Sequence, residues 1–366
     1  MYSQNDLDDA VASGAMSAES ATALRSFVEG QRSLPSVDEE HFRLITGFND
    51  IFVSIAAAIL LFAVGWIGQS IGQSMGLIID GDGPSPLAPA AVAATAWGLA
   101  LFFTAKRRMA LPSILLLLAF VGGLFATSAF ALVLAIGEQS LNDNQVLGGI
   151  LAATAAAIAA AGAWLHWRRF KVPITVAAGG AAVAAIAVAL LVSLIGTPID
   201  EMRDIILGFV LLLGIGMFLF AMRWDSSDPA RITRRSDVAF WLHLLAAPMI
   251  VHPIFTLLGL NDGNATIIEG LVVVALYVAL GVTALAIDRR ALLVSALAYV
   301  LFALQALFRQ FGAVELNVAL TALVIGSSLL LLSAFWHQAR VVIVKRLPES
   351  LQGRLPTLSR VGAAAA

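Results

Sequence analysis

The feature that most constrains this chain is a succession of long apolar segments between residues 49 and 337. Ten segments of about 17 to 25 residues can be distinguished, and a helix of this length crosses the roughly 30 Å hydrocarbon core of a bilayer. Because open strands cannot satisfy their backbone hydrogen bonds in lipid, we expect every segment to be helical. The predicted fold is therefore an all-α polytopic membrane bundle of about ten transmembrane helices. Their ranges are 51–72, 88–105, 111–136, 147–165, 174–196, 205–222, 238–260, 266–286, 291–308 and 313–336.

The composition narrows the classes of function. The chain is 60% hydrophobic and 13% charged, whereas a soluble domain is about half apolar and about a quarter charged. The net charge of −2 gives no indication of nucleic-acid binding, and the absence of cysteine excludes disulfides and thiolate metal sites. The sequence has no nucleotide-binding loop, serine-nucleophile motif, zinc-protease motif or metal-ligand spacing. We therefore expect no enzyme activity, no cofactor and no metal.

The positions of Lys and Arg predict the orientation. Of the 22 basic residues, all but Arg203 and Arg309 fall in the two termini or in alternate loops. Cytoplasmic loops are enriched in Lys and Arg, so this side is predicted to be the cytoplasm, with both termini cytoplasmic. The regular alternation also supports the number of spans, since a missed span would put later basic clusters on the wrong side.

The fourth and fifth apolar segments are rich in alanine, with the runs AATAAAIAAAGA and AAGGAAVAAIAVA. Small residues allow helices to approach closely in lipid, where burial from water supplies no driving force. We expect these two segments to be closely packed helices in the centre of the bundle.

The seventh segment combines ionisable side chains with helix breakers. It contains Pro248 and Pro253, with His252 directly before the second proline. Each proline lacks an N–H group and clashes with a carbonyl one turn earlier, so we expect a kinked or broken helix. One interpretation is a proton-relay, ion or substrate site at His252. The other is an ordinary proline kink. His243 lies nine residues earlier, on the opposite helix face, and is predicted to be a surface histidine near the cytoplasm.

A second group of polar residues is predicted near the outer leaflet. Gln69 ends the first span, Glu269 begins the eighth, and Gln305 and Arg309 end the ninth. Together with His252 they could line a polar pocket that opens to the outside, with Glu269 and Arg309 paired. The alternative is a set of unrelated interfacial residues.

The polar N-terminus is predicted to be a small separate region. Residues 1–30 are expected to form a cytoplasmic helical hairpin whose second helix begins at Ser17, and 31–48 a linker. Two short helices bury too little surface to be stable alone, so the hairpin would rest on the membrane domain or on a second copy, or bind a protein partner. The transmembrane domain covers 49–337, and 338–366 is a cytoplasmic tail.

The pattern LDDAVASGAMSAESATALRSFV resembles the start of an uncharacterised bacterial membrane-protein family, the domain-of-unknown-function family 2157 and its relatives. The likeness lies in a helix, a glycine-containing turn and a serine-led second helix, and it covers about the first 70 residues. The resemblance implies a bacterial cytoplasmic (inner) membrane but no activity and no site residue.

Two functions remain in competition. The first is a secondary transporter of a small solute or ion, with its site at the seventh span. The alternative is a membrane-anchored scaffold or sensor that acts through the N-terminal hairpin. A membrane enzyme that acts on lipid or quinone is the least favoured. The expected environment of the chain is the lipid bilayer. A homo-oligomer is compatible with the sequence for either function.

Overall fold

The computed structural model divides the chain into two compact units, Met1–Phe42 with Ser359–Ala366, and Arg43–Leu358. In the first unit, a short helix over 18–24 begins where the Ser17 hydroxyl accepts a hydrogen bond from the Ser20 amide at 3.1 Å. Residues 1–10 and 25–30 of the predicted hairpin and the 31–47 part of the linker lie outside the described residues. The structure describes residues 11, 13–14, 16–24, 48–142, 144–199, 201–229, 231, 233–259, 267–290, 292–293, 297, 301, 317–353, 355–356 and 358.

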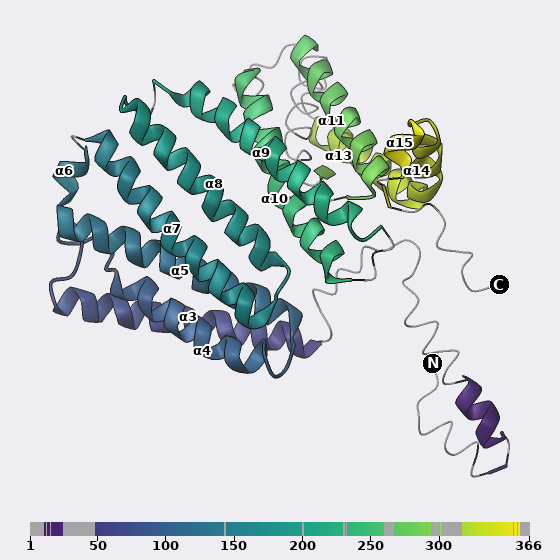
Figure 1. Cartoon of the computed structure of the whole chain (residues 1–366), viewed down its shortest axis with the longest axis horizontal. Helices are drawn as coiled ribbons and strands as arrows, with labels where there is room; N and C mark the ends of the chain where they lie inside the picture. Colours follow the sequence, from purple (N-terminus) through teal and green to yellow (C-terminus); the bar gives the residue numbers. More distant parts are fainter. Residues whose placement is uncertain are drawn as a thin grey trace. The chain divides into compact units, whose positions relative to one another are not determined.

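All regular secondary structure among the described residues of the second unit is helical (Figure 1). Segments predicted from apolar runs coincide with helices up to residue 287, and the tenth coincides with a helix from residue 317. The ninth predicted segment lies mostly outside the described residues. The helices are α3 (Phe48–Ser74), α4 (Leu87–Phe103), α5 (Ala110–Ile136), α6 (Glu138–Asn142), α7 (Gln145–Phe170), α8 (Ile174–Ile195), α9 (Arg203–Ser226), α10 (Arg234–Leu257), α11 (Ile267–Ile287), α13 (Asn317–Ala334), α14 (Trp336–Lys345) and α15 (Glu349–Gln352).

Within the described part of the chain, six helices are long and apolar enough to cross a membrane: α3, α5, α7, α8, α9 and α10. A seventh span results if α13 and α14, which are bent by 72° at residue 335, are counted together. Helix α4 and the 271–287 part of α11 are apolar but shorter. By length and composition these helices fit an integral membrane protein of the helical-bundle type, while the predicted number of ten spans is not established.

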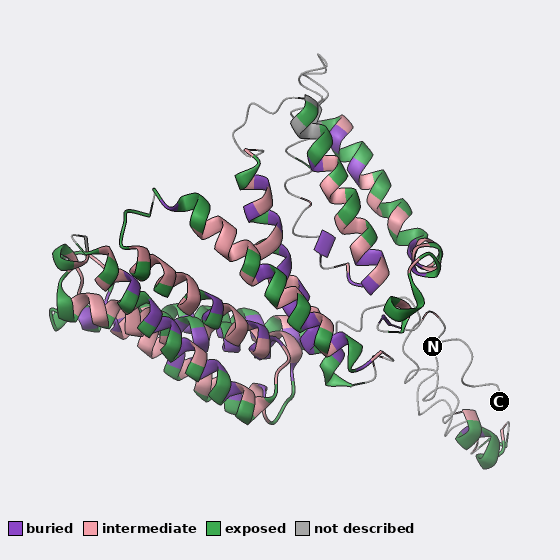
Figure 2. Cartoon of the chain, turned by 45° about the horizontal axis from the view of Figure 1, so that its top comes forward, coloured by how far each residue is buried: buried purple, intermediate pink, exposed green. Residues whose placement is uncertain are grey.

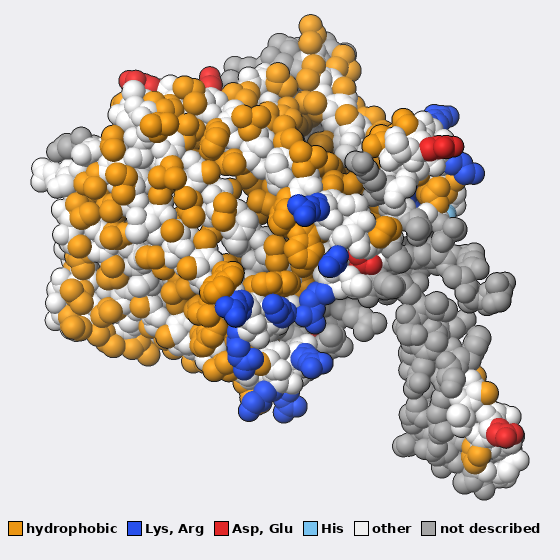
Figure 3. All heavy atoms as spheres, viewed as in Figure 1, with side chains coloured by type: hydrophobic (Ala, Val, Ile, Leu, Met, Phe, Trp, Pro, Cys, Tyr) orange, Lys and Arg blue, Asp and Glu red, His pale blue; other side chains and the backbone are white. Residues whose placement is uncertain are grey.

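Neighbouring helices in the chain are also neighbours in space from α3 to α10. The alanine-rich helices α7 and α8 are in close contact, as their composition predicts. A methyl group added at Gly149 would lie 2.7 Å from the Ala189 carbonyl oxygen, so only glycine permits this approach. Around the bundle, large apolar side chains such as those of Phe62, Leu194 and Leu219 are exposed (Figures 2 and 3). This apolar surface is what a lipid environment requires.

Helix α10 continues through both of its prolines. It runs from Arg234 to Leu257 with Pro248 and Pro253 inside it. The sequence predicts a kinked or a broken helix at these prolines, and the structure shows that the helix is not broken. The helix begins at Thr233, whose hydroxyl accepts a hydrogen bond from the Arg235 amide at 3.3 Å.

Candidate functional site

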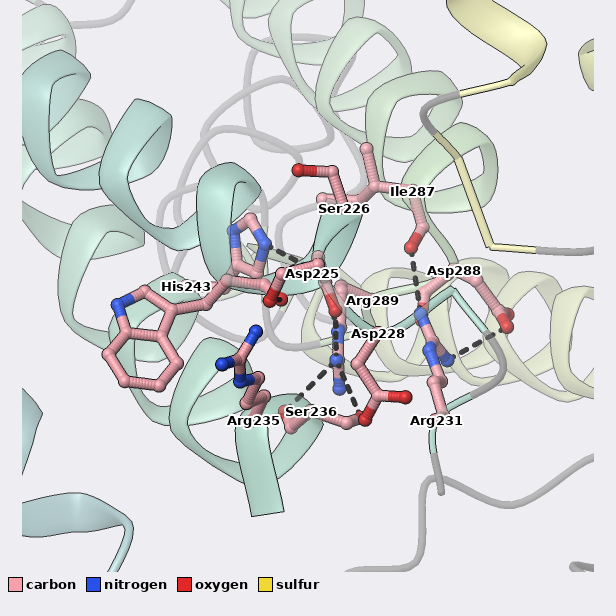
Figure 4. A network of polar contacts seen from close by, with 12 residues as sticks. Asp225, Ser226, Asp228, Arg231, Arg235, Ser236, His243, Ile287, Asp288 and Arg289 are labelled. Carbon is pink, nitrogen blue, oxygen red and sulfur yellow. Dashed lines mark hydrogen bonds and ion pairs between the residues drawn. The ribbon is translucent and has the colours of Figure 1, made fainter. Parts of the chain in front are cut away.

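A cluster of buried charged side chains joins the ends of α9, α10 and α11 (Figure 4). Asp225, in the last turn of α9, has only 1% of its surface exposed. Its carboxylate accepts two hydrogen bonds from Arg289, one from Nη2 to Oδ1 at 2.5 Å and one from Nε to Oδ2 at 3.1 Å. His243 Nε2 lies 3.1 Å from the same Oδ2 atom. One carboxylate is thus shared by a guanidinium and an imidazole.

Arg289 reaches this cluster because of the way α11 ends. After Ile287 the chain turns at Asp288, which has a positive φ of 57°, and the Arg289 amide returns to the Ala284 carbonyl at 2.8 Å. The guanidinium then enters the bundle, where it is 2% exposed. Its Nη2 also donates to the carbonyl and hydroxyl oxygens of Ser236, both at 3.1 Å. One side chain therefore ties α11 to both α9 and α10.

His243 is completely buried, and its ring packs edge-on against Phe218 at a centroid distance of 5.2 Å. Because Nε2 faces a carboxylate oxygen, which accepts hydrogen bonds, Nε2 is the protonated nitrogen and donates to Asp225. The other nitrogen, Nδ1, is buried and has no hydrogen-bond partner among the described residues. A second proton at Nδ1 would create an unpaired buried N–H group beside the positive Arg289. The resting cluster is therefore best described as ionised Asp225, ionised Arg289 and neutral His243.

A neighbouring cluster, outside the spanning helices, is centred on Asp288. Its carboxylate accepts hydrogen bonds from Arg231 Nη1 at 2.9 Å and from Trp336 Nε1 at 2.8 Å. Arg340 Nε lies 3.8 Å away. Burial alone would raise the pKa of Asp288, but the guanidinium groups of Arg231 and Arg340 and the Trp336 hydrogen bond hold it below its usual value. This cluster fastens the end of α11 to α14 and to residue 231.

A second fully buried histidine has a different environment. The Nδ1 atom of His166, near the end of α7, lies 3.2 Å from the Thr175 hydroxyl of α8. Its ring is surrounded by Trp97, Phe120 and Phe170. The hydroxyl is a neutral partner, so this contact joins two helices without placing a charge between them. The Asp225 cluster is the better candidate for chemistry that depends on charge.

The residues predicted to form an outer pocket are only partly within the described chain. The Gln69 side chain donates to the Gly83 carbonyl at 3.0 Å and accepts from the Ser85 amide at 2.8 Å, so it holds the loop before α4. His252 is exposed on α10, between the buried Pro253 and Val251.

The other members of that pocket lie beyond what the structure describes. Glu269 is in the first turn of α11, but its side chain is not among the described ones, and Gln305 and Arg309 are outside the described residues. The outer pocket therefore stays a prediction.

The Asp225 cluster was not predicted from the sequence. Arg289 is one of the basic residues that the sequence places in predicted cytoplasmic loops, and His243 is predicted to be a surface histidine. The second expectation is wrong, since His243 is completely buried. A usable signal was present: Asp225 lies three residues after the sixth apolar segment and His243 five residues into the seventh, so packing of these two segments against each other would bury both. Only the contact between α9, α10 and the end of α11 identifies Arg289 as their partner.

Comparison with protein-family models, with curated proteins and with solved structures finds no match to this chain. The resemblance of the N-terminal residues to family 2157 therefore stays a prediction.

Proposed function

We propose that this chain is a secondary transporter of a small solute in a bacterial inner membrane, and that Asp225, His243 and Arg289 form its proton-coupling site. The observation that supports this most directly is the sharing of one buried carboxylate between a guanidinium and an imidazole. Burial of ions at the ends of apolar helices is costly, and apolar side chains of similar volume would hold the helices together as well or better. Ionisable groups kept at such positions commonly serve proton or ion pathways.

The proposed coupling follows from a competition for Asp225. In the resting state its carboxylate holds Arg289. A proton taken from water, bound at Asp225 Oδ2 or at His243 Nδ1, weakens that attraction. In the first case the carboxylate becomes neutral, and in the second the imidazolium competes with the guanidinium for it. Release of Arg289 would free the end of α11 from α9 and α10, and its return would expel the proton.

The test is proton movement in proteoliposomes that contain a pH-sensitive dye. A panel of amino acids, sugars, carboxylates and alkali-metal cations is added outside, and the internal pH is followed. We expect at least one solute to drive a pH change with the natural sequence. The balanced double variant Asp225→Asn/Arg289→Gln, which leaves no unpaired charge, should abolish this change. If no solute moves protons, or if the double variant moves them as well as the natural protein, the proposal fails.

The chain provides a matched control for this experiment. The double variant Asp288→Asn/Arg231→Gln also removes one Asp–Arg pair, but from the neighbouring cluster. Both side chains of this pair are mostly buried. The variant should lower the melting temperature and keep the solute-driven pH change. Loss of the pH change in both double variants would show that general loosening of this region, rather than the Asp225 site, is responsible.

The scaffold or sensor alternative is separated by complementation of a deletion strain. A chain that lacks residues 1–40 should restore the phenotype if the protein is a transporter, whereas Asp225→Asn/Arg289→Gln should not. The opposite pattern would favour a partner-binding role of the N-terminal region.

A further inference from the structure

Two loops that are far apart in the sequence are held together at one end of the bundle. The Arg234 side chain, in the first turn of α10, donates from Nη1 to the carbonyl oxygen of Lys171 at 3.3 Å. Lys171 closes α7 in the left-handed conformation and leads into α8. This contact brings the basic residues that precede α8 next to those that begin α10.

The result is a concentrated basic surface, which we call the basic patch. All five of its side chains are exposed. Figure 3 shows Lys and Arg side chains gathered at this end of the helices. Asp237, in the first turn of α10, offsets part of the charge. The patch consists of Arg168, Arg169, Lys171, Arg234 and Arg235.

An apolar stripe of α7 leads directly into the basic patch. Ile158, Trp164 and Leu165 are 42%, 59% and 49% exposed. Trp164 and Leu165 precede Arg168 by four and three residues, and Ile158 precedes Leu165 by seven, so each side chain has a neighbour on the side of α7 that carries Arg168. The Arg168 guanidinium lies over the Trp164 ring at 4.9 Å. Exposed tryptophan next to cationic side chains is typical of the boundary between acyl chains and headgroups.

We propose that the basic patch and this stripe bind an anionic phospholipid, with the phosphate headgroup at the basic patch and an acyl chain along the stripe. The basic residues supply the complementary charge, because Lys and Arg near an anionic lipid surface strengthen binding to it. The apolar stripe distinguishes a lipid from free phosphate, which would gain nothing from Ile158 or Leu165. This proposal is independent of transport.

The test is native mass spectrometry of the full chain from micelles that contain equal amounts of phosphatidylglycerol and phosphatidylcholine with identical acyl chains. The natural protein should retain phosphatidylglycerol preferentially. Arg168→Gln/Arg169→Gln/Lys171→Gln and Arg234→Gln/Arg235→Gln should each lower that preference at least about tenfold. The control Lys345→Gln/Arg346→Gln removes two exposed basic residues from the end of α14 and should keep it. Equal preference in all four proteins, or equal loss in the control, would overturn the proposal.

A second measurement needs no charge variant and therefore does not depend on correct insertion of one. Tryptophan fluorescence of the natural protein should be quenched more by phosphatidylglycerol with brominated acyl chains than by brominated phosphatidylcholine. Trp164→Phe should remove most of this difference, and raising the salt from about 50 mM to about 500 mM should reduce it by screening. The same quenching by both lipids at low salt would contradict a headgroup-selective site.

Discussion

Asp288 and Arg289 are adjacent in the chain, yet their side chains join different helices. Asp288 binds Arg231, whereas Arg289 enters the bundle to bind Asp225 (Figure 4). Asp288 also accepts a hydrogen bond from the Trp336 indole. The turn that ends α11 is thereby fixed from two sides. A movement of α11 relative to α9 and α10 must break the contacts of Arg289. The position of the end of α11 therefore depends on the charge of Asp225, which holds Arg289.

The first prediction concerns the strength of the Asp225–Arg289 pair. Asp225→Asn leaves the buried guanidinium of Arg289 without its counter-charge, and Arg289→Gln leaves the buried carboxylate without its main partner. Each single variant should lose about 3–5 kcal/mol of unfolding free energy. The double variant should lose clearly less than the sum, because its buried groups carry no unbalanced charge. Thermal unfolding in one detergent measures all four proteins, and additive losses would show that the two side chains do not act as a pair.

The extent to which the sequence predicts this structure differs between the fold and the site. Segment length and apolarity are local properties, and they place α3 and α5 correctly, as they do the alanine-rich α7 and α8. For α10 the sequence predicts either a kinked or a broken helix and cannot decide between them. Membrane helices can accommodate proline when neighbouring groups satisfy the freed carbonyls.

The candidate site depends on contacts between residues that are far apart in the chain. Arg289 and Asp225 are separated by 64 positions, and nothing local distinguishes Arg289 from Arg290 beside it. The first is buried in the bundle, while the second lies over the Trp336 ring. Charge placement in a loop predicts the side of the membrane, but it cannot tell which of two neighbouring arginines turns inward.

A second prediction follows from the lowered pKa of Asp288. Because its pKa in the folded protein is below the ordinary value of about 3.9, its contribution to stability is complete above that pH and is lost as the pH falls through the folded-state pKa. Asp288→Asn should therefore destabilise the protein at pH 7, and its difference from the natural protein should shrink below about pH 4. Melting temperatures of both proteins across this range test the prediction. The exposed Asp82→Asn serves as a control and should change stability by less than about 0.5 kcal/mol.

A third prediction concerns the crossing of α9 and α10. A Cβ atom at Gly214 would lie 2.8 Å from the backbone carbonyl carbon of Met249, and backbone cannot yield as a flexible side chain can. Gly214→Ala should therefore force the helices apart and cost about 1–3 kcal/mol. Gly216 lies one half-turn further along α9 and meets nothing within 4 Å. Gly216→Ala should be neutral or slightly stabilising, since alanine favours the helix. Equal melting temperatures for the two variants would show that the close approach at Gly214 has no energetic consequence.

The fourth prediction concerns orientation, which in the proposed transporter would determine the side from which a proton reaches Asp225. The basic loops 106–108 and 168–171 and the start of α10 lie at the same ends of their helices as Asp225 and His243. If positive loops face the cytoplasm, the Asp225 cluster lies near the cytoplasmic face, and the loop between α3 and α4 faces the periplasm. A cysteine introduced at Gly81, in a chain that has no other cysteine, should react with a membrane-impermeant maleimide added to intact spheroplasts. A cysteine at Arg107 should react only after the membrane is opened. Labelling of Arg107→Cys but not Gly81→Cys in intact spheroplasts would invert the map, and the proton would then reach the Asp225 cluster from outside the cell.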